Sequence, residues 1–290
     1  MAISEWIDRV AIRFRRAGLH FGHGTTSAET EAAWIAARVC RIFPRNIETY
    51  LDRPLSMGER ARADLIAEMR IRERKPLAYL LKEAWLARNR FYVDERVIVP
   101  RSHLAEITAT GLRPWVASPA NVKRGLDLCT GSACLAILLA KSFPSARIDA
   151  ADLSSDALAV ARINVVRYKL QKRLRLFESD LFEKISSRVR YDIILSNPPY
   201  VNNLAMKALP IEYGHEPRLA LSGGTDGLRL LLRIIQSARK FLAPGGLLVL
   251  EVGHNKRALE SALPRMPLIW LDTPGAPDMV ALIEAAHLPK

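Results

Sequence analysis

The sequence predicts an α/β fold in which seven short strands form a mainly parallel sheet beside a small helical domain. The chain has 290 residues, more than one domain usually holds. The first hundred residues carry apolar side chains at helical spacing, whereas from about Pro100 onward short apolar strands alternate with helical segments. Such alternation is typical of right-handed βαβ units, so we expect two packed units.

The N-terminal unit is expected to contain three helices. Apolar residues recur at helical spacing in residues 4–16, 26–43 and 56–74. Ser56 and Glu59 form a capping-box pattern at the start of the third helix, and Lys75-Pro76 ends it. We therefore predict a helical domain over residues 1–75.

A connector is expected between the helical domain and the sheet. The segments Trp85–Arg88 and Phe91–Val99 have strand-like patterns, and Pro100 closes the second. This predicts a β-hairpin connector over residues 76–100, which leaves residues 101–290 for the sheet domain.

The sheet domain contains seven predicted strands. They cover residues 125–128, 147–151, 174–177, 191–196, 247–251, 268–271 and 279–283. Only residues 272–278 join the last two strands, which is too short for a helical crossover. We therefore expect an antiparallel strand at the C-terminal end of an otherwise parallel sheet.

The composition excludes several classes of protein. With 49% hydrophobic and 25% charged residues, the chain is neither disordered nor a collagen. The longest apolar run, Ala133–Ala140, is too short to cross a membrane, and residues 1–9 lack the pattern of a signal peptide, so we expect a cytoplasmic protein. Its three cysteines form no CxxC or Cys/His cluster, which predicts reduced thiols and no metal site.

The chain is strongly basic, with a formal net charge of +13. This charge favours polyanionic binding partners such as RNA or a ribosome-associated substrate. An organism whose proteins are generally rich in arginine explains the charge equally well. One stretch has no acidic residue and six basic ones, Arg162, Arg167, Lys169, Lys172, Arg173 and Arg175. It is either a solvated helix face or a phosphate-binding surface that allows direct nucleic-acid contact.

The turn after the first predicted strand has the features of a nucleotide-binding loop. The strand ends in Asp127-Leu128, and the small residues around Gly131 lead directly into a helix that begins at Cys134. Asp152 ends the second strand, where an acid can accept both hydroxyls of a ribose. Alternatively, Asp152 only caps the helix that begins near Ser154.

The fourth predicted strand runs into Asn197-Pro198-Pro199-Tyr200. Two prolines stiffen this loop, which lies at the carboxyl edge of the sheet where open α/β sheets bind ligands. A planar NH₂ group needs two hydrogen-bond acceptors, and the Asn197 side-chain oxygen and the Pro198 carbonyl supply two. The sequence therefore predicts a site for an amide or a similar NH₂ group.

These motifs resemble those of the class I S-adenosylmethionine-dependent methyltransferases with the NPPY signature, and among them the N(5)-glutamine methyltransferases. The resemblance spans most of the chain. It rests on residues 78–80, 83–85, 93–102, 127–132, 179–182, 197–200 and 215–221. The branch that modifies peptide-release factors typically has Pro-Arg-Pro before its first Rossmann-like helix and glycine where this chain has Cys129. Pro100-Arg101-Ser102, Cys129 and His215 are instead similar to the branch that modifies ribosomal protein L-three.

The resemblance implies a Rossmann-like methyltransferase sheet, S-adenosyl-L-methionine as the cofactor, and a protein substrate bound by the helical domain. Asn197 and Pro198 would bind the glutamine amide, in a pocket shaped by Pro199 and Tyr200. Asp152 would hold the ribose, and Leu181 with Asp180 would border the adenine. The cofactor-binding residues implied are Asp127, Cys129, Thr130, Gly131, Ser132, Ala133, Asp152, Asp180, Leu181 and Asn197.

The chain departs from the family pattern at two positions. Ala133 stands where the family normally has glycine, and His103 stands where this branch usually has proline. An added methyl group at position 133 would crowd a closely approaching ligand.

Three other functions remain open from the sequence. They are methylation of a peptide-release factor, N6-methylation of adenine in a nucleic acid, and a catalytically silent role in ribosome assembly. Adenine also presents an exocyclic NH₂ group, but the connector and His215-Glu216-Pro217 favour glutamine. The transfer needs in-line positioning of the amide nitrogen rather than a strong base or a metal, because the methyl donor is already activated.

Overall fold

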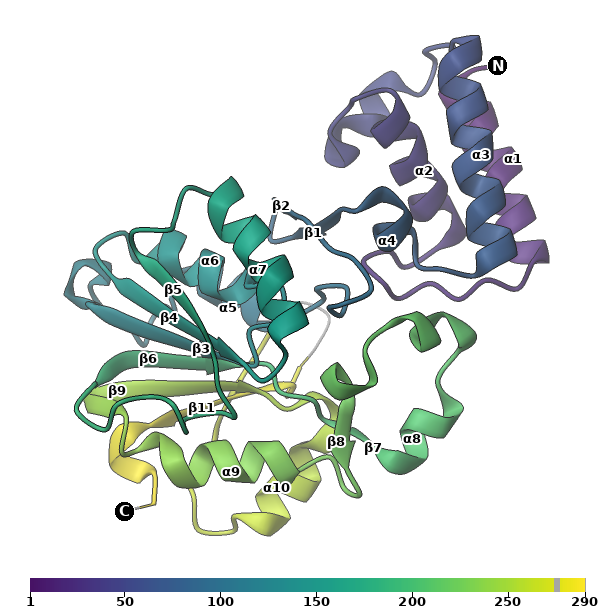
Figure 1. Cartoon of the computed structure of the whole chain (residues 1–290). Coiled ribbons are helices and arrows are strands. Elements are labelled where there is room, and N and C mark those ends of the chain that lie inside the picture. The colour runs from purple at the N-terminus through teal and green to yellow at the C-terminus, as the bar shows by residue number, and fades with distance from the viewer. Residues whose placement is uncertain (274–276, 290) are drawn as a thin grey trace.

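The computed structural model describes residues 1–273 and 277–289. Its central sheet has seven strands in the order β10-β11-β9-β6-β3-β4-β5 (Figure 1). The strands are β3 (Arg124–Leu128), β4 (Arg147–Asp152), β5 (Leu174–Glu178), β6 (Tyr191–Ser196), β9 (Leu242–Glu251), β10 (Ile269–Leu271) and β11 (Val280–Glu284).

The strand directions confirm the predicted sheet. Strands β5, β4, β3, β6 and β9 are mutually parallel, and β11 pairs antiparallel with both β9 and β10. Of the predicted link over residues 272–278, residues 274–276 lie outside the described part. Strand β9 begins five residues earlier than the predicted start at Leu247, because Gly245 at a φ of +75° lets the strand turn and continue.

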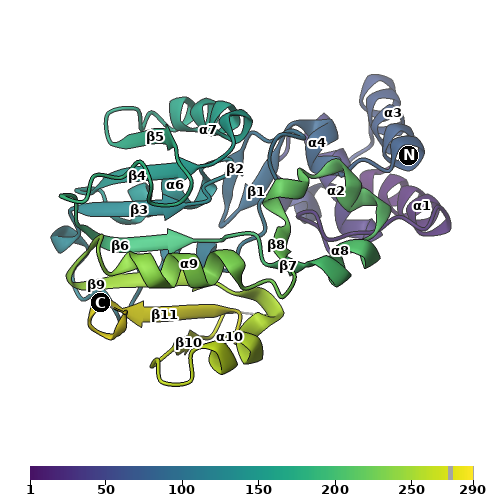
Figure 2. The same cartoon turned by 60° about the horizontal axis from the view of Figure 1, so that its bottom comes forward.

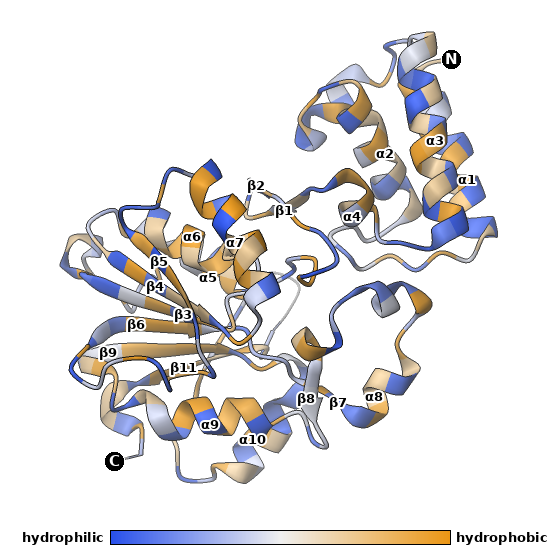
Figure 3. Ribbon diagram, in the orientation of Figure 1, coloured by the Kyte–Doolittle hydropathy of each residue, from blue (hydrophilic) through white to orange (hydrophobic). Residues whose placement is uncertain are grey.

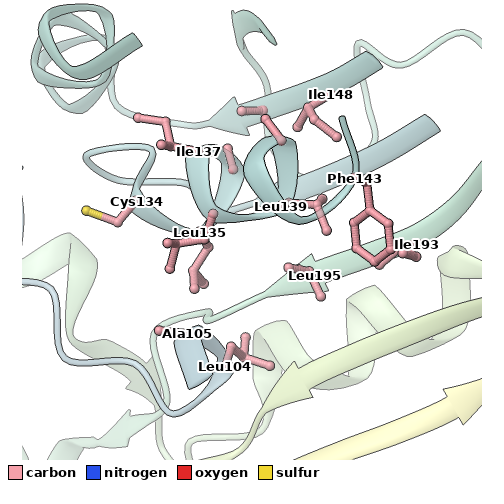
Figure 4. Packing of buried hydrophobic residues seen from close by; sticks show 14 of the residues in the cluster. Leu104, Ala105, Cys134, Leu135, Ile137, Leu139, Phe143, Ile148, Ile193 and Leu195 are labelled. Atoms are coloured by element: carbon pink, nitrogen blue, oxygen red, sulfur yellow. The ribbon is translucent and has the colours of Figure 1, made fainter. Parts of the chain in front are cut away.

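Helices cover both faces of the sheet. On one face lie α5 (Leu104–Ala109), α6 (Cys134–Ser142) and α7 (Ser155–Arg167), as Figure 1 shows, and on the other α9 (Arg229–Ala238) and α10 (Lys256–Ala262), which Figure 2 shows below the sheet. Each face has its own apolar core, and Figure 4 shows side chains of α5 and α6 packed over β6. Figure 3 shows how strongly β9 is coloured as hydrophobic, consistent with a strand that is buried along most of its length.

The N-terminal segment contains helices where the sequence predicted them. They are α1 (Ile3–Arg16), α2 (Ala28–Val39), the 3-10 helix η1 (Pro44–Tyr50), α3 (Met57–Glu73) and the short α4 (Leu77–Leu81). The Ser56–Glu59 capping box is present. Helix α2 ends four residues before the predicted Phe43, because Arg41 has a φ of +58° and Pro44 starts η1. None of the described helices is long and apolar enough to span a membrane.

The connector is partly mispredicted. A hairpin is present, with β1 (Ala84–Leu86) and β2 (Asn89–Phe91) joined by Ala87 and Arg88, both at positive φ. The second strand was expected over Phe91–Val99 and this is wrong, because the chain turns at Asp94. Its carboxylate accepts from the backbone N–H of Arg96 at 3.1 Å, and its carbonyl accepts from Val97 at 3.1 Å.

The valines that produced the strand pattern have another role. Val93, Val97 and Val99 are buried in the apolar core of the helical unit, and Ala157 and Val160 of α7 belong to the same core. The helical unit, the connector and one helix of the sheet domain are therefore packed together. The boundaries at residues 75 and 100 stay predictions.

An insertion over residues 201–224 follows the Asn-Pro-Pro-Tyr loop and was not predicted. It contains β7 (Val201–Asn202), α8 (Asn203–Ala208), η3 (Ile211–His215), η4 (Arg218–Ala220) and β8 (Ser222–Gly224). Strands β7 and β8 pair with each other, and the rest of the insertion extends toward the helical unit (Figure 1). The remaining 3-10 helices are η2 (Pro119–Asn121), η5 (Gly253–Asn255) and η6 (Ala285–His287).

Candidate active site

A cavity of about 310 Å³ lies at the carboxyl ends of β3, β4 and β6. Seven of the predicted site residues line it, namely Cys129, Gly131, Asp152, Asp180, Leu181, Asn197 and Pro199. The other side is formed by connector residues 95–98 and by Pro217, Leu219 and Ala220 of the insertion. Asp127, Thr130, Ser132, Ala133, Pro198 and Tyr200 are not among its lining residues.

The loops that form the cavity have unusual backbone conformations. Cys129, Ala133 and Leu181 have φ values of +56°, +62° and +49°, and Gly131 between them has +54°. Non-glycine residues rarely adopt this left-handed region, and such strain is concentrated at functional sites. The glycine that the family normally has in place of Ala133 would adopt this conformation without strain.

Ala133 immediately precedes helix α6, as its N-cap residue, and is fully buried in the core between the sheet and α6. Its methyl group therefore lies against protein atoms. The sequence suggested that this methyl group crowds the ligand. In the structure Ala133 does not line the cavity, and its methyl group packs against the apolar core instead.

Asp127 connects the loop that follows β3 to helix α6 through hydrogen bonds. One carboxylate oxygen accepts from the Thr130 hydroxyl at 2.6 Å and from the Ala136 backbone N–H at 3.0 Å, which ties the loop to the start of α6. The other oxygen is buried and has no hydrogen-bond partner within the described residues. Burial raises the pKa of Asp127 to about 7, because an ionised carboxylate loses its hydration there.

Asp152 joins two loops at the cavity wall. Its carboxylate oxygens accept from the Gly131 N–H at 2.8 Å and from the Ser154 N–H at 2.9 Å. The Ser154 side chain, rather than Asp152, caps helix α7 by accepting from Ala157. Each oxygen of Asp152 keeps a lone pair for a ligand, because a carboxylate oxygen can accept two hydrogen bonds.

Asn197 and Pro198 present unused acceptors at the end of β6. Ser196 donates to the Leu128 carbonyl at 2.9 Å and holds β6 against β3, so the following loop starts from a fixed point. Asn197 is half-buried at the cavity. Within the described residues, no group donates a hydrogen bond to its side-chain oxygen or to the Pro198 carbonyl.

Tyr200 is fixed by two hydrogen bonds and by close packing against three glycines. Its hydroxyl donates to Glu251 at 3.0 Å, and its carbonyl accepts from the Asn255 side chain at 3.0 Å. Three glycines make room for it: a Cβ atom at Gly253 would lie 2.5 Å from the Tyr200 ring, one at Gly227 would lie 2.4 Å from its carbonyl oxygen, and one at Gly223 would lie 2.7 Å from its Cα.

Glu251 is the main site residue that the sequence interpretation missed. It ends β9, is fully buried, and accepts from the Ser102 hydroxyl at 2.5 Å and the His103 backbone N–H at 3.0 Å, besides Tyr200. Burial raises its pKa. The signal for it in the sequence was an acidic residue at the end of an otherwise apolar predicted strand. The contact also gives His103 a role, since the proline usual in this branch has no N–H to donate.

Two of the three segments that distinguish the branches, residues 100–102 and the segment that begins at His215, lie against each other. Arg101 forms a bidentate ion pair with Glu216, with both N···O distances 2.6 Å, and Glu216 also accepts from the Val99 N–H at 2.9 Å. Burial alone would raise the pKa of Glu216, but Arg101 and His23 lower it to about 2. Through Val99 and Arg101, Glu216 therefore joins the end of the connector and the residue after it to the insertion, beside the cavity.

Comparisons with known proteins agree with this site. Residues 115–211 match the family model of the methyltransferase small domain. The chain is 47% identical to the ribosomal protein uL3 glutamine methyltransferase of Bordetella pertussis, over 99% of this chain and 96% of the relative. The enzymes of the same name from Neisseria meningitidis and Burkholderia pseudomallei are 47% and 44% identical, over 95% and 99% of this chain and 90% and 95% of the relatives.

Among solved structures, the hMettl16 catalytic domain in complex with MAT2A 3′UTR hairpin 6 matches with a TM-score of 0.51 and 15% identity. The match covers 78% of this chain and 81% of that one, and it supports the fold alone. The near full-length identity to the curated relatives is decisive: this chain is a methyltransferase and belongs to the ribosomal protein uL3 glutamine methyltransferase family.

Proposed function

We propose that this protein transfers the methyl group of S-adenosyl-L-methionine to the side-chain amide nitrogen of a glutamine in ribosomal protein uL3. The observation that carries the proposal is a pair of unused acceptors, one at Asn197, which lines the same cavity as Asp152, and one at Pro198, the residue that follows it. An amide NH₂ group has two N–H bonds, and these two oxygens suit it.

The residues around the cavity suit S-adenosyl-L-methionine. Asp152 has lone pairs free for the ribose hydroxyls, and Leu181 with Asp180 lines the wall where the adenine would lie. The unpartnered oxygen of Asp127 is a buried acceptor near the loop and suits the cationic methionine end of the cofactor. When bound, the cofactor supplies a methyl group on a sulfonium that is already activated.

The protein's own contribution is positioning. Asn197 and Pro198 accept hydrogen bonds from the two amide N–H groups and hold the nitrogen in line for transfer. This positioning lowers the activation barrier by roughly 7 kcal/mol or more. The same oxygens stabilise the positive charge that develops on nitrogen. The proton leaves to water after the transfer. Tyr200, held by Glu251 and by the glycines, keeps the loop in place.

Recognition of the protein substrate is assigned to the helical unit and the insertion. Every glutamine offers the same amide, so selection depends on contacts outside the Asn197–Pro198 pair. Pro217 and Leu219 of the insertion line the cavity, and Glu212 of the insertion pairs with Arg74 of the helical unit at 2.9 Å. A substrate lying across both units reaches the cavity from this side.

The test is methyl transfer to purified, unmethylated uL3, a peptide-release factor and a mixed RNA, with the cofactor radiolabelled in its methyl group. We expect label in uL3 only. Label in the release factor or in RNA, with none in uL3, would assign the activity to one of the rival substrates. Binding of the cofactor without label in any of them would indicate the silent assembly protein.

A further inference from the structure

A small cleft on the helical unit carries aromatic and cationic side chains and is separate from the active site. It has a volume of about 290 Å³ and is lined by Phe43, Pro44, Arg45, Trp85 and Arg88. No acidic residue lines this cleft within the described part of the chain. Phe43 is 58% exposed, which is unusual for a large apolar ring on a helical surface.

The rings of the cleft are held in place. Phe43 and Trp85 meet edge to face with centroids 5.9 Å apart, and the Arg45 guanidinium lies 5.8 Å from the Phe43 centroid. The Trp85 indole N–H donates to Glu83 at 2.9 Å, which fixes the orientation of the ring. Glu83 is itself buried, and its carboxylate pairs with Arg38 at 3.8 Å and Arg90 at 3.5 Å.

Basic residues continue from this cleft across the hairpin to α7. We call them the basic strip: Arg88, Arg90, Lys141, Arg162, Arg167, Lys169 and Lys172. Tyr168 joins its two halves, because its hydroxyl donates to the Arg90 carbonyl at 3.0 Å and the Lys141 ammonium lies 5.5 Å from its ring.

Most of the strip is free to meet a ligand. All seven residues are exposed, and only Arg90 forms an ion pair with a described residue, with Glu83 at 3.5 Å. Two members of the predicted basic stretch are occupied elsewhere. Arg173 donates to the Ala140 and Ala146 carbonyls, and Arg175 pairs with Asp149, so four of the six basic residues of the stretch belong to the strip.

We propose that the cleft and the basic strip bind single-stranded RNA. Unpaired bases stack on the Phe43 and Trp85 rings beside the guanidinium groups, and the backbone phosphates follow the strip. An acidic peptide would match the charge but has no flat rings for the exposed aromatics. In a duplex the bases already stack on each other, so their faces are unavailable.

The binding inference goes beyond the proposed function and stands on this surface alone. Only the choice of RNA over DNA rests on the proposed function, because a ribosomal-protein substrate assembles with RNA. The cleft shares no lining residue with the active-site cavity, and methyl transfer and RNA binding are measured separately, so the two can fail independently.

The experiment measures fluorescence anisotropy of labelled RNA of about 16 nucleotides with the full-length protein, at several salt concentrations. The probes are single-stranded RNA, the same RNA as a duplex, and single-stranded DNA. Phe43→Ala removes a stacking ring, and Tyr50→Ala is its control, because Tyr50 is an exposed aromatic residue outside the cleft. Arg167→Glu/Lys172→Glu reverses two charges of the strip, and Arg188→Glu/Arg257→Glu makes the same change of charge at exposed positions elsewhere.

We expect Phe43→Ala to weaken binding of single-stranded RNA about fivefold or more, and Tyr50→Ala to leave it unchanged. The strip variant lowers the salt dependence by about 0.7 per lost phosphate contact, whereas its control does not. Equal effects of variant and control would show non-specific attraction to a basic protein and overturn the proposal. Preference for the duplex would overturn the stacking role, and tighter binding of DNA would overturn the assignment to RNA.

Discussion

Asn197 is the residue on which the acceptor site depends. Its side chain lies at the cavity with its oxygen unused, directly after a strand that Ser196 holds against β3. Removing this oxygen leaves the amide nitrogen of the substrate with one positioned acceptor instead of two.

Asn197→Ala is therefore expected to lower the rate of methyl transfer about 10²- to 10³-fold while cofactor affinity changes little. Single-turnover rates and calorimetric titration with S-adenosyl-L-methionine measure the two quantities. Asn121→Ala, at an exposed position of η2, is the control. A rate above half of the wild-type value would remove Asn197 from the acceptor site.

Asp127 predicts a pH dependence of stability. Its pKa is raised from 3.8 to about 7 in the folded chain, so the folded state keeps a proton that the unfolded state releases as the pH rises from about 4 to about 7. Over this window the group lowers the free energy of unfolding. Asp127→Asn cannot titrate, and thermal unfolding of the cofactor-free proteins between pH 5 and 7.5 should show a steeper loss of stability in the wild type. Parallel curves for the two proteins would contradict the raised pKa.

The sequence revealed the loop after β3, next to Asp127, and the loop that begins at Asn197, because each loop follows a recognisable strand. It did not reveal Glu251 or the Arg101–Glu216 pair as structural partners. Ser102 and Glu251 are 149 positions apart, and Arg101 and Glu216 are 115 apart. Contacts of this kind depend on tertiary packing and leave no local pattern.

At the scale of elements, the Asn-Pro-Pro-Tyr loop is positioned by neighbouring turns. Gly253 has a φ of +59° and its missing Cβ leaves space for the Tyr200 ring, while Asn255 of the same turn binds the Tyr200 carbonyl. The loop therefore has its geometry from β6 on one side and from the end of β9 on the other.

Gly253→Ala is expected to lower methyl transfer about 10- to 100-fold, because the Tyr200 ring and the loop must shift. Gly214→Ala is a matched control, since an added Cβ there meets no atom within 4 Å. Steady-state rates with both variants, each checked for cofactor binding, provide the measurement. A full rate for Gly253→Ala would mean that the position of Tyr200 does not matter to the reaction.

Strand and helix periodicity predicted the sheet well, since six of its seven strands are five residues or longer. It failed for Phe91–Val99, where the valines pack into the helical core and the Asp94–Arg96 turn interrupts the strand. It also missed the insertion, whose two strands are only two and three residues long. Such short strands depend on the glycines packed against Tyr200 rather than on their own pattern.

At the scale of the whole molecule, a buried ionic group ties the helical unit to the insertion. Arg70 of α3 is 1% exposed and donates to Glu31 of α2 at 2.5 Å, and it lies 3.6 Å from Glu212 of the insertion. Arg70 also donates to the His20 carbonyl at 2.8 Å. The catalytic and helical units are therefore held by charges as well as by apolar contacts.

Arg70→Met is expected to lower the free energy of unfolding by about 3–5 kcal/mol, because it leaves buried carboxylates without their partner. The control Arg13→Met breaks a surface pair with Glu68 and should cost less than about 1 kcal/mol. Urea unfolding of the two variants checks this difference. Similar small losses in both would show that the buried group does not hold the units together.

The most direct test of the proposed reaction is mass spectrometry of uL3 purified from cells that lack this protein, before and after incubation with the enzyme and S-adenosyl-L-methionine. We predict a gain of about 14 Da on the side chain of a single glutamine, and no gain with Asn197→Ala. A uL3 whose mass stays unchanged with the wild-type enzyme, or that gains the methyl group at a residue other than glutamine, would contradict the account.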